Sequence, residues 1–192
     1  MRANSLAFLL IGFGLGFAAM FYFIKPRAAE LAKPLPVFAQ SGGGSSAASK
    51  PPLDTARLKE LEDSVKSNPA NFEAMVELGN MQFDQQNYDA AAGWYRKALD
   101  VRPQEVSVRT DLGTALFYSN HIDESLTELR KSLELNPTHP QTLFNIGVVL
   151  LDGKKDTKGA LEAWDKLVAT NPNFPQIAIV KQQIAALREQ QK

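Results

Sequence analysis

Apolar residues recur at helical spacing from Asp54 to the C-terminal region of this 192-residue chain. The pattern predicts a first helix over 54–67, which ends at Asn68-Pro69 because proline cannot continue a helix and restricts the residue before it. Three helix pairs follow, and a last helix is predicted to begin at Pro175, since proline is favoured in a first helical turn. The pairs are predicted at 71–85 with 88–101, 105–119 with 122–135, and 139–152 with 157–170.

The helix pairs repeat with a nearly constant period. The residues that mark this period lie 34 or 35 positions apart: Gly79, Gly113 and Gly147, and Pro69, Pro103, Pro137 and Pro172. Such a period is typical of stacked arrays of one supersecondary unit, in which each unit buries its apolar face against its neighbours. Small residues such as Gly79, Ala91 and Ala98 recur where two helices must cross closely.

These residues resemble the tetratricopeptide repeat (TPR) family over Phe72–Asn173, with Asp54–Asn71 as a leading half-repeat. The eight signature positions of the family, W-L-G-Y-A-F-A-P, are filled in the first unit by Met75, Leu78, Gly79, Gln82, Ala91, Tyr95, Ala98 and Pro103. The resemblance implies an all-α TPR α-solenoid over residues 53–192. Its three repeats would lie near 72–105, 106–139 and 140–174, followed by a capping helix at 175–191.

Two positions depart from the family pattern. Arg109 stands where the family usually has a buried Trp, so its guanidinium needs a partner or access to solvent. The third unit carries one extra residue near 153–156, and we expect a longer turn between its two helices.

The N-terminal segment predicts a membrane anchor, residues 1–24. Residues 5–24 carry no charge, and at 1.5 Å per residue they span about 30 Å, the thickness of a bilayer's hydrocarbon core. A cleaved signal peptide is the alternative, but Lys25 and Arg27 follow the apolar run where a small-residue cleavage site belongs. We therefore expect an uncleaved, single-pass N-terminal transmembrane helix in the cell (inner) membrane.

The flanking charges leave the side of the membrane that carries the soluble domain open. Gly12 and Gly16 form a GxxxG pair, which would let two spans approach closely as a homodimer. Residues 25–52 contain Pro-rich and Gly/Ser-rich stretches, including Ser41–Ser49, and have no apolar periodicity. This composition predicts a flexible linker with a reach of about 30 Å.

Composition excludes several classes of function. From residue 52 onward the chain has sixteen basic and twenty acidic residues, which does not favour nucleic-acid binding. There is no cysteine, and the two histidines, His121 and His139, are isolated at predicted turns or helix starts. No nucleophile motif, phosphate loop or metal-ligand pair appears. We therefore expect no enzyme activity, cofactor or metal.

By resemblance, the leading helix of each TPR unit lines a concave groove. The predicted partner-binding residues in this groove are Val76, Asn80, Phe83, Thr110, Thr114, Phe117, Tyr118, Phe144, Asn145, Val148 and Leu151. Cochaperone TPR domains grip a terminal carboxylate with Lys, Arg and Asn at set positions, of which only Asn80 is present, so a chaperone-tail ligand is disfavoured. The groove instead favours an apolar, neutral or basic peptide or amphipathic helix of a partner protein, with aromatic anchors.

The leading hypothesis is a membrane-tethered scaffold or adaptor that recruits a protein partner. Bacterial membrane-anchored TPR proteins of similar layout include accessory factors of cytochrome c maturation and of envelope biogenesis, so the chain also suggests an assembly or biogenesis factor. The alternatives are a self-assembling structural protein, whose repeats stack between chains, and a regulatory subunit of a membrane enzyme complex.

Overall fold

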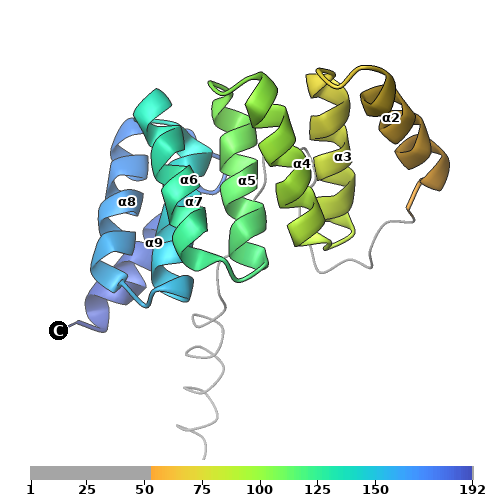
Figure 1. Cartoon of the computed structure of the whole chain (residues 1–192). Coiled ribbons are helices and arrows are strands. Elements are labelled where there is room, and N and C mark those ends of the chain that lie inside the picture. The colour runs from red at the N-terminus through yellow and green to blue at the C-terminus, as the bar shows by residue number, and fades with distance from the viewer. Residues whose placement is uncertain (1–52, 192) are drawn as a thin grey trace, which may run out of the picture. The chain divides into compact units, whose positions relative to one another are not determined.

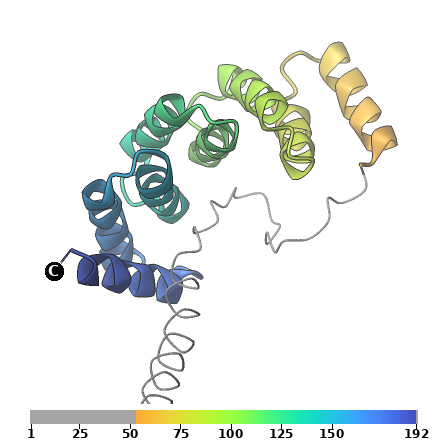
Figure 2. The ribbon, with the colours of Figure 1, turned by 90° about the horizontal axis from the view of Figure 1, so that it is seen from below.

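The computed structural model describes residues 53–191, and every regular element within that range is a helix. The elements are α2 (Thr55–Ser67), α3 (Phe72–Asp84), α4 (Tyr88–Val101), α5 (Val106–Tyr118), α6 (Ile122–Leu135), α7 (Pro140–Val148), the π-helical turn η1 (Val149–Gly153), α8 (Thr157–Thr170) and α9 (Ile177–Glu189). The helices stack side by side in a curved row, as Figures 1 and 2 show. The all-α repeat solenoid predicted from the sequence is confirmed for this part of the chain.

Each helix pair crosses tightly at its glycine. A Cβ atom added to Gly79 would lie 2.5 Å from Cε1 of Tyr95, and one added to Gly113 would lie 2.6 Å from Cγ of Leu129. At Gly147 the added atom would overlap the indole ring of Trp164. The three large side chains are fully buried, so the periodic glycines are the contact points on which the paired helices close.

The two helices of every pair are joined by a three-residue turn with one geometry. The middle residue of the turn has positive φ in each case: Gln86 (59°), Asn120 (66°) and Lys155 (58°). In the first two turns the next N–H donates to a carbonyl five residues back, from Asn87 to Gln82 at 2.9 Å and from His121 to Leu116 at 2.8 Å. This is the Schellman pattern, which satisfies the last carbonyls of a helix.

The extra residue of the third unit lies inside a helix, so the prediction of a longer turn is wrong. The turn Lys154–Asp156 has three residues like the other two, but the N–H of Asp156 donates to the carbonyl of Leu150, six residues back, at 2.8 Å. The additional position is absorbed by η1, which widens the last helical turn. Widening the helix keeps both the turn and the stacking of α7 on α8 intact.

The strained turn residues predict a gain in stability. Lys155→Gly should raise the free energy of unfolding by about 0.5–1 kcal/mol, because glycine adopts positive φ without a Cβ clash. Gln86→Gly should act alike, whereas Asn120→Gly should change little, since Asn tolerates this conformation. Urea unfolding followed by circular dichroism measures the effect, and a loss of stability at position 155 would contradict it.

The last helix begins later than the sequence predicts. The N–H of Ile177 donates to the carbonyl of Phe174 at 2.9 Å, so residues 174–177 form a turn with Pro175 at its second position. α9 starts after this turn, at Ile177, with Gln176 as its N-terminal flanking residue. The fixed φ of proline suits both positions, which is why the pattern alone placed the start at Pro175.

Arg109 has the partner that its position demands. Its Nη1 donates to Oε2 of Glu128 at 2.6 Å and its Nη2 to the carbonyl of Pro103 at 2.7 Å. The two charged side chains are only 14% and 17% exposed. Burial alone would raise the pKa of Glu128, but hydrogen bonds from Lys131 and Arg109 outweigh it and hold the pKa below its ordinary value.

Removal of this ion pair should lower the free energy of unfolding by an amount that depends on pH. Glu128→Gln should lower the free energy of unfolding by about 1–2 kcal/mol at neutral pH, because the buried guanidinium loses its charge partner. A depressed pKa in the folded state stabilises above the ordinary pKa of Glu, and the stabilisation is lost as pH falls through the folded-state pKa. The deficit of Glu128→Gln should therefore shrink as the pH falls below the ordinary pKa of Glu and through the lowered folded-state pKa of Glu128. Glu162→Gln, on the exposed face of α8, is the control and should have little effect.

No helix within residues 53–191 is both long and apolar enough to cross a membrane. The predicted span at residues 5–24, its Gly12/Gly16 pair and the linker 25–52 lie outside the residues that the structure describes. They stay predictions from the sequence.

Candidate protein-interaction surface

Four aromatic side chains meet along one edge of the helix row, where α3 and α5 end. Phe83 is the second-to-last residue of α3, Tyr88 is the first residue of α4, and Phe117 and Tyr118 are the last two residues of α5. They meet because α3 and α5 both end, and α4 begins, at the three-residue turns, which lie at the lower side of Figure 1. We call these four residues the aromatic end patch.

The rings of the patch are in direct contact. Tyr88 stacks on Tyr118 with 4.9 Å between ring centroids, and Phe83 meets both rings edge-on at 5.1 and 5.7 Å. Phe117 lies 5.6 Å from Tyr118. Such arrangements stabilise aromatic pairs beyond the area they bury. The patch is therefore an ordered surface rather than a set of separately mobile side chains.

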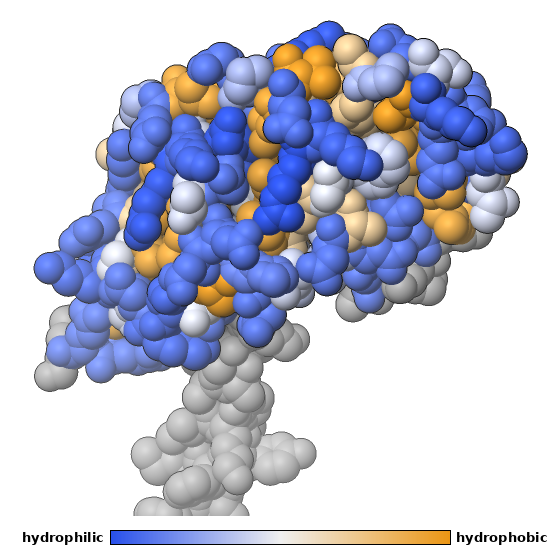
Figure 3. Space-filling model, in the orientation of Figure 1, coloured by the Kyte–Doolittle hydropathy of each residue, from blue (hydrophilic) through white to orange (hydrophobic). Residues whose placement is uncertain are grey.

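The patch is open to solvent at Tyr118. This side chain is 37% exposed, while Phe83, Tyr88 and Phe117 are half-buried. Partial burial raises the pKa of the Tyr88 hydroxyl above its ordinary value. On the face drawn in Figure 3, hydrophobic side chains are exposed in separate areas between hydrophilic ones. An amphipathic ring such as that of Tyr118 is the kind of side chain that anchors protein interfaces.

Five of the predicted groove residues lie in the interior instead. Thr110, Thr114 and Asn145 are fully buried, and Phe144 and Val148 are 1% exposed. A partner cannot touch them while the repeats remain stacked. In the structure each of them packs or hydrogen-bonds between helices, and their role in binding stays a prediction from the sequence.

Three of the five join the second repeat to the third. Asn145 Nδ2 donates to Thr114 Oγ1 at 2.9 Å, and the hydroxyls of Thr110 and Thr142 are 2.7 Å apart. Thr142 also contacts Nδ1 of His139 at 2.7 Å, and burial lowers the pKa of this histidine. Because these polar side chains are short, α5 and α7 can approach closely. The side chains satisfy one another's hydrogen-bonding groups in the buried contact.

The other two are covered from the C-terminal side. Phe144 and Val148 share a buried cluster with Trp164 and with residues of α9. Phe174, in the loop before α9, lies 5.7 Å from the ring of Phe144. The C-terminal helix thus caps the third repeat by occupying the surface that the groove prediction left open.

Three groove residues remain at partly exposed positions. Val76 packs at the edge of the first repeat's core, and Asn80 accepts a hydrogen bond from the Tyr95 hydroxyl at 2.8 Å. Leu151 lies in η1, where the extra residue shifts the register. Counted back from the turn, Asp152 rather than Leu151 aligns with Phe83 and Phe117. Of the predicted set, Phe83, Phe117 and Tyr118 therefore meet in the aromatic end patch.

Tyr88 is the patch residue that the sequence prediction missed. It fills the first position of a trailing helix, whereas the groove was assigned to leading helices. The signal that could have found it is the turn length, because a three-residue connection places Tyr88 beside Phe83.

Two carboxylates border the patch. Asp84 follows Phe83, and Asp152 precedes Gly153, where an added Cβ would lie 3.4 Å from Phe117. Burial raises the pKa of Asp84. Burial also raises the pKa of Asp152, with Lys155 acting in the opposite direction. Among residues 53–191, Asp84 has neither an ion pair nor a hydrogen-bond partner for its carboxylate.

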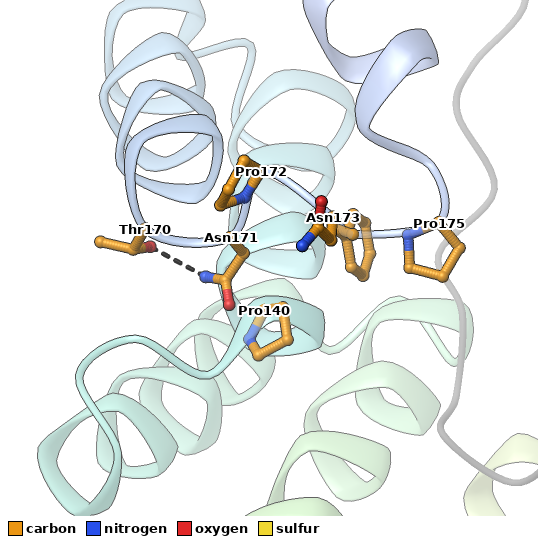
Figure 4. A pocket seen from close by; sticks show the side chains of 7 residues that line it. Pro140, Thr170, Asn171, Pro172, Asn173 and Pro175 are labelled. Carbon is orange, nitrogen blue, oxygen red and sulfur yellow. Dashed lines mark hydrogen bonds between the residues drawn. The ribbon is translucent and has the colours of Figure 1, made fainter.

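A pocket of about 380 Å³ lies elsewhere, in the loop between α8 and α9 (Figure 4). Prolines Pro140, Pro172 and Pro175 line it with Phe174, and no charged side chain does. Asn171 Nδ2 donates to Thr138 O of the α6–α7 loop at 2.9 Å and to Thr170 Oγ1 at 2.8 Å. No group of three or more potential metal ligands occurs in the described part of the chain.

The comparisons agree with this architecture. The family model described as "Tetratricopeptide repeat" matches residues 58–106 and 110–176, more than half of the chain, so the protein belongs to the TPR family.

Two solved structures superpose on the chain. A crystal structure of MamA matches with a TM-score of 0.64 and 21% identity, covering 70% of this chain and 76% of MamA. The TPR domain of Arabidopsis OM64 matches with a TM-score of 0.55 and 14% identity, covering 62% and 94%. At these identities the likeness concerns the fold. A search of curated proteins gives no match.

Proposed function

We propose that this protein is a membrane-tethered scaffold that holds a segment of a partner protein against the aromatic end patch. The observation that supports this proposal is the cluster of four aromatic rings in contact, in which the side chain of Tyr118 is exposed to solvent. TPR domains act as protein–protein interaction scaffolds, and this patch offers an anchor surface on such a scaffold. The apolar residues 5–24 support the tether, and the composition of 25–52 supports a flexible spacer between the two.

Site-specific photo-crosslinking in the native cells tests the patch. A benzophenone amino acid placed at Asp89, beside Tyr88 on α4, should form a discrete adduct in the full-length protein. The same group at Asp100, an exposed acid at the other end of α4, is the matched control and should form none. The adduct at position 89 should disappear with Tyr118→Ala. Identical adducts at both positions would reject the patch.

The tether has its own experiment. The full-length chain should stay with membranes after alkaline extraction, and deletion of residues 5–24 should release it. Recovery of the intact chain in the soluble fraction would reject the anchor without bearing on the patch. Whether the span dimerises through Gly12 and Gly16 is a separate proposal, which Gly12→Leu tests through the mass of the detergent-solubilised protein.

Self-assembly by end-to-end stacking is the second candidate. It needs an apolar face on both terminal helices, and the solvent-facing positions of α2 include Lys59, Glu62 and Asp63. On α9, at the opposite end of the row, Ile179 is the large hydrophobic residue that is exposed, at 50%. The charged residues on the exposed face of α2 disfavour end-to-end stacking and favour the scaffold function. Light scattering of the full chain in detergent separates the candidates, because stacking predicts a mass that grows with protein concentration.

A further inference from the structure

We infer that the partner segment carries a basic side chain, seated against Asp84, next to an apolar or aromatic residue that packs on Tyr118. This inference rests on the proposed function, because it names the chemistry of the segment that the aromatic end patch receives. It follows from the charges at the edge of the helix row where α3 and α5 end.

The helix ends at the patch are electrostatically one-sided. α3 and α5 both end here, and neither has a basic residue in its last turn to offset the negative end of the helix dipole. α4 and α6 begin here, and their positive ends are already offset by Asp89, Asp123 and Glu124 in the first turns. The negative ends of the α3 and α5 helix dipoles therefore have no basic residue of their own last turns to offset them. The carboxylates of Asp84 and Asp152 add further negative charge nearby.

The nearby cations are engaged on the other side of the patch. Lys154 pairs with Asp123 at 2.6 Å, and Lys155 acts on Asp152. On the α3–α4 side, Asp84 has no ion pair among the described residues, and Asp89 meets only His121 Nε2, at 3.4 Å. The unmet demand for a cation therefore lies at Asp84, the residue that follows Phe83, whose ring meets that of Tyr118 at 5.7 Å.

This arrangement suits arginine better than lysine. The Asp84 side chain is exposed, partial desolvation raises the pKa of its carboxyl, and a cation beside it would favour the charged form. The faces of Tyr88 and Tyr118 carry negative quadrupole potential, and a planar guanidinium can stack on such a ring while it donates to a carboxylate. Arginine meets both demands with one side chain, so we expect affinity to fall in the order Arg, Lys, Gln, Glu.

Fluorine NMR of the full-length, 3-fluorotyrosine-labelled protein in detergent micelles tests the inference. The probes are the acetylated, amidated tripeptides Phe-Arg-Leu, Phe-Gln-Leu and Phe-Glu-Leu. The Arg peptide should shift the Tyr88 and Tyr118 signals in the millimolar range. The signal of Tyr95, which is fully buried, should stay in place as an internal reference. The Gln peptide should bind at least about fivefold more weakly, and added salt should remove that difference.

Matched variants separate the charge from the patch. Asp84→Asn should weaken the Arg peptide about fivefold and leave the Gln peptide unchanged, while Asp100→Asn should change neither. Equal binding of the Arg and Gln peptides, or an unaffected Asp84→Asn variant, would overturn the inference and leave the aromatic patch standing. Absence of any shift with all three peptides would overturn the inference together with the patch as a binding surface.

Discussion

Gly147→Ala should lower the free energy of unfolding by about 2 kcal/mol. The added methyl group would overlap the indole ring of Trp164, which is fully buried. The ring cannot swing aside freely, because its Nε1 donates to the carbonyl of Phe144 at 3.0 Å. Overpacking a rigid core costs about 1–3 kcal/mol or more, against the ~1 kcal/mol that alanine gains over glycine in a helix. Urea unfolding of the full chain, followed by circular dichroism, measures the change.

Gly93 provides the matched control. It also lies within a helix, α4, but an added Cβ would meet nothing within 4 Å. Gly93→Ala should therefore raise the free energy of unfolding by about 0.5–1 kcal/mol through helix propensity alone. If both variants changed stability in the same direction, the account of the periodic glycines as close-packing points would be wrong.

The order within the glycine series follows from the facing side chain. Gly113 faces Leu129, a flexible aliphatic side chain, whereas Gly79 and Gly147 face the rings of Tyr95 and Trp164. A leucine can change rotamer and a fixed ring cannot, so Gly113→Ala should cost less than Gly147→Ala. The repeat period therefore specifies where two helices touch. The side chain that faces each glycine sets how much stability an added methyl group costs there.

The fold was predictable because its signals are local and repeated. The spacing of glycines, prolines and apolar residues is read along the chain without knowing what lies beside it. Arg109 could likewise be expected to need a partner, and Glu128 supplies it. The extra residue of the third unit misled the prediction, since a helix with an inserted π turn and a longer loop have the same length in sequence.

The interaction surface was harder to predict because burial depends on the neighbour. Thr110 and Asn145 occupy groove positions by family register, yet hydroxyl and amide contacts between α5 and α7 bury both. Phe144 is buried because the loop before α9 places Phe174 against it. No periodicity reveals how a capping helix docks. Tyr118, at the end of α5, keeps 37% of its surface exposed, whereas the ring of Phe83 is half-buried against it.

Phe144 and Tyr118, both predicted as partner anchors, should respond to alanine in opposite ways. Phe144→Ala should lower the free energy of unfolding by about 3–5 kcal/mol, because the side chain is 1% exposed in the cluster around Trp164. Tyr118→Ala should cost only about 1 kcal/mol, because it loses ring contacts with Tyr88 and Phe83 at a site already open to solvent.

The two variants also separate packing from binding. Tyr118→Ala should keep the helical circular dichroism of the wild type and lose the adduct formed from position 89. Val101→Ala, which truncates an equally exposed apolar side chain at the opposite end of α4, should keep both. An adduct that survives Tyr118→Ala but is lost in a still-folded Phe144→Ala protein would move the binding surface to the third repeat.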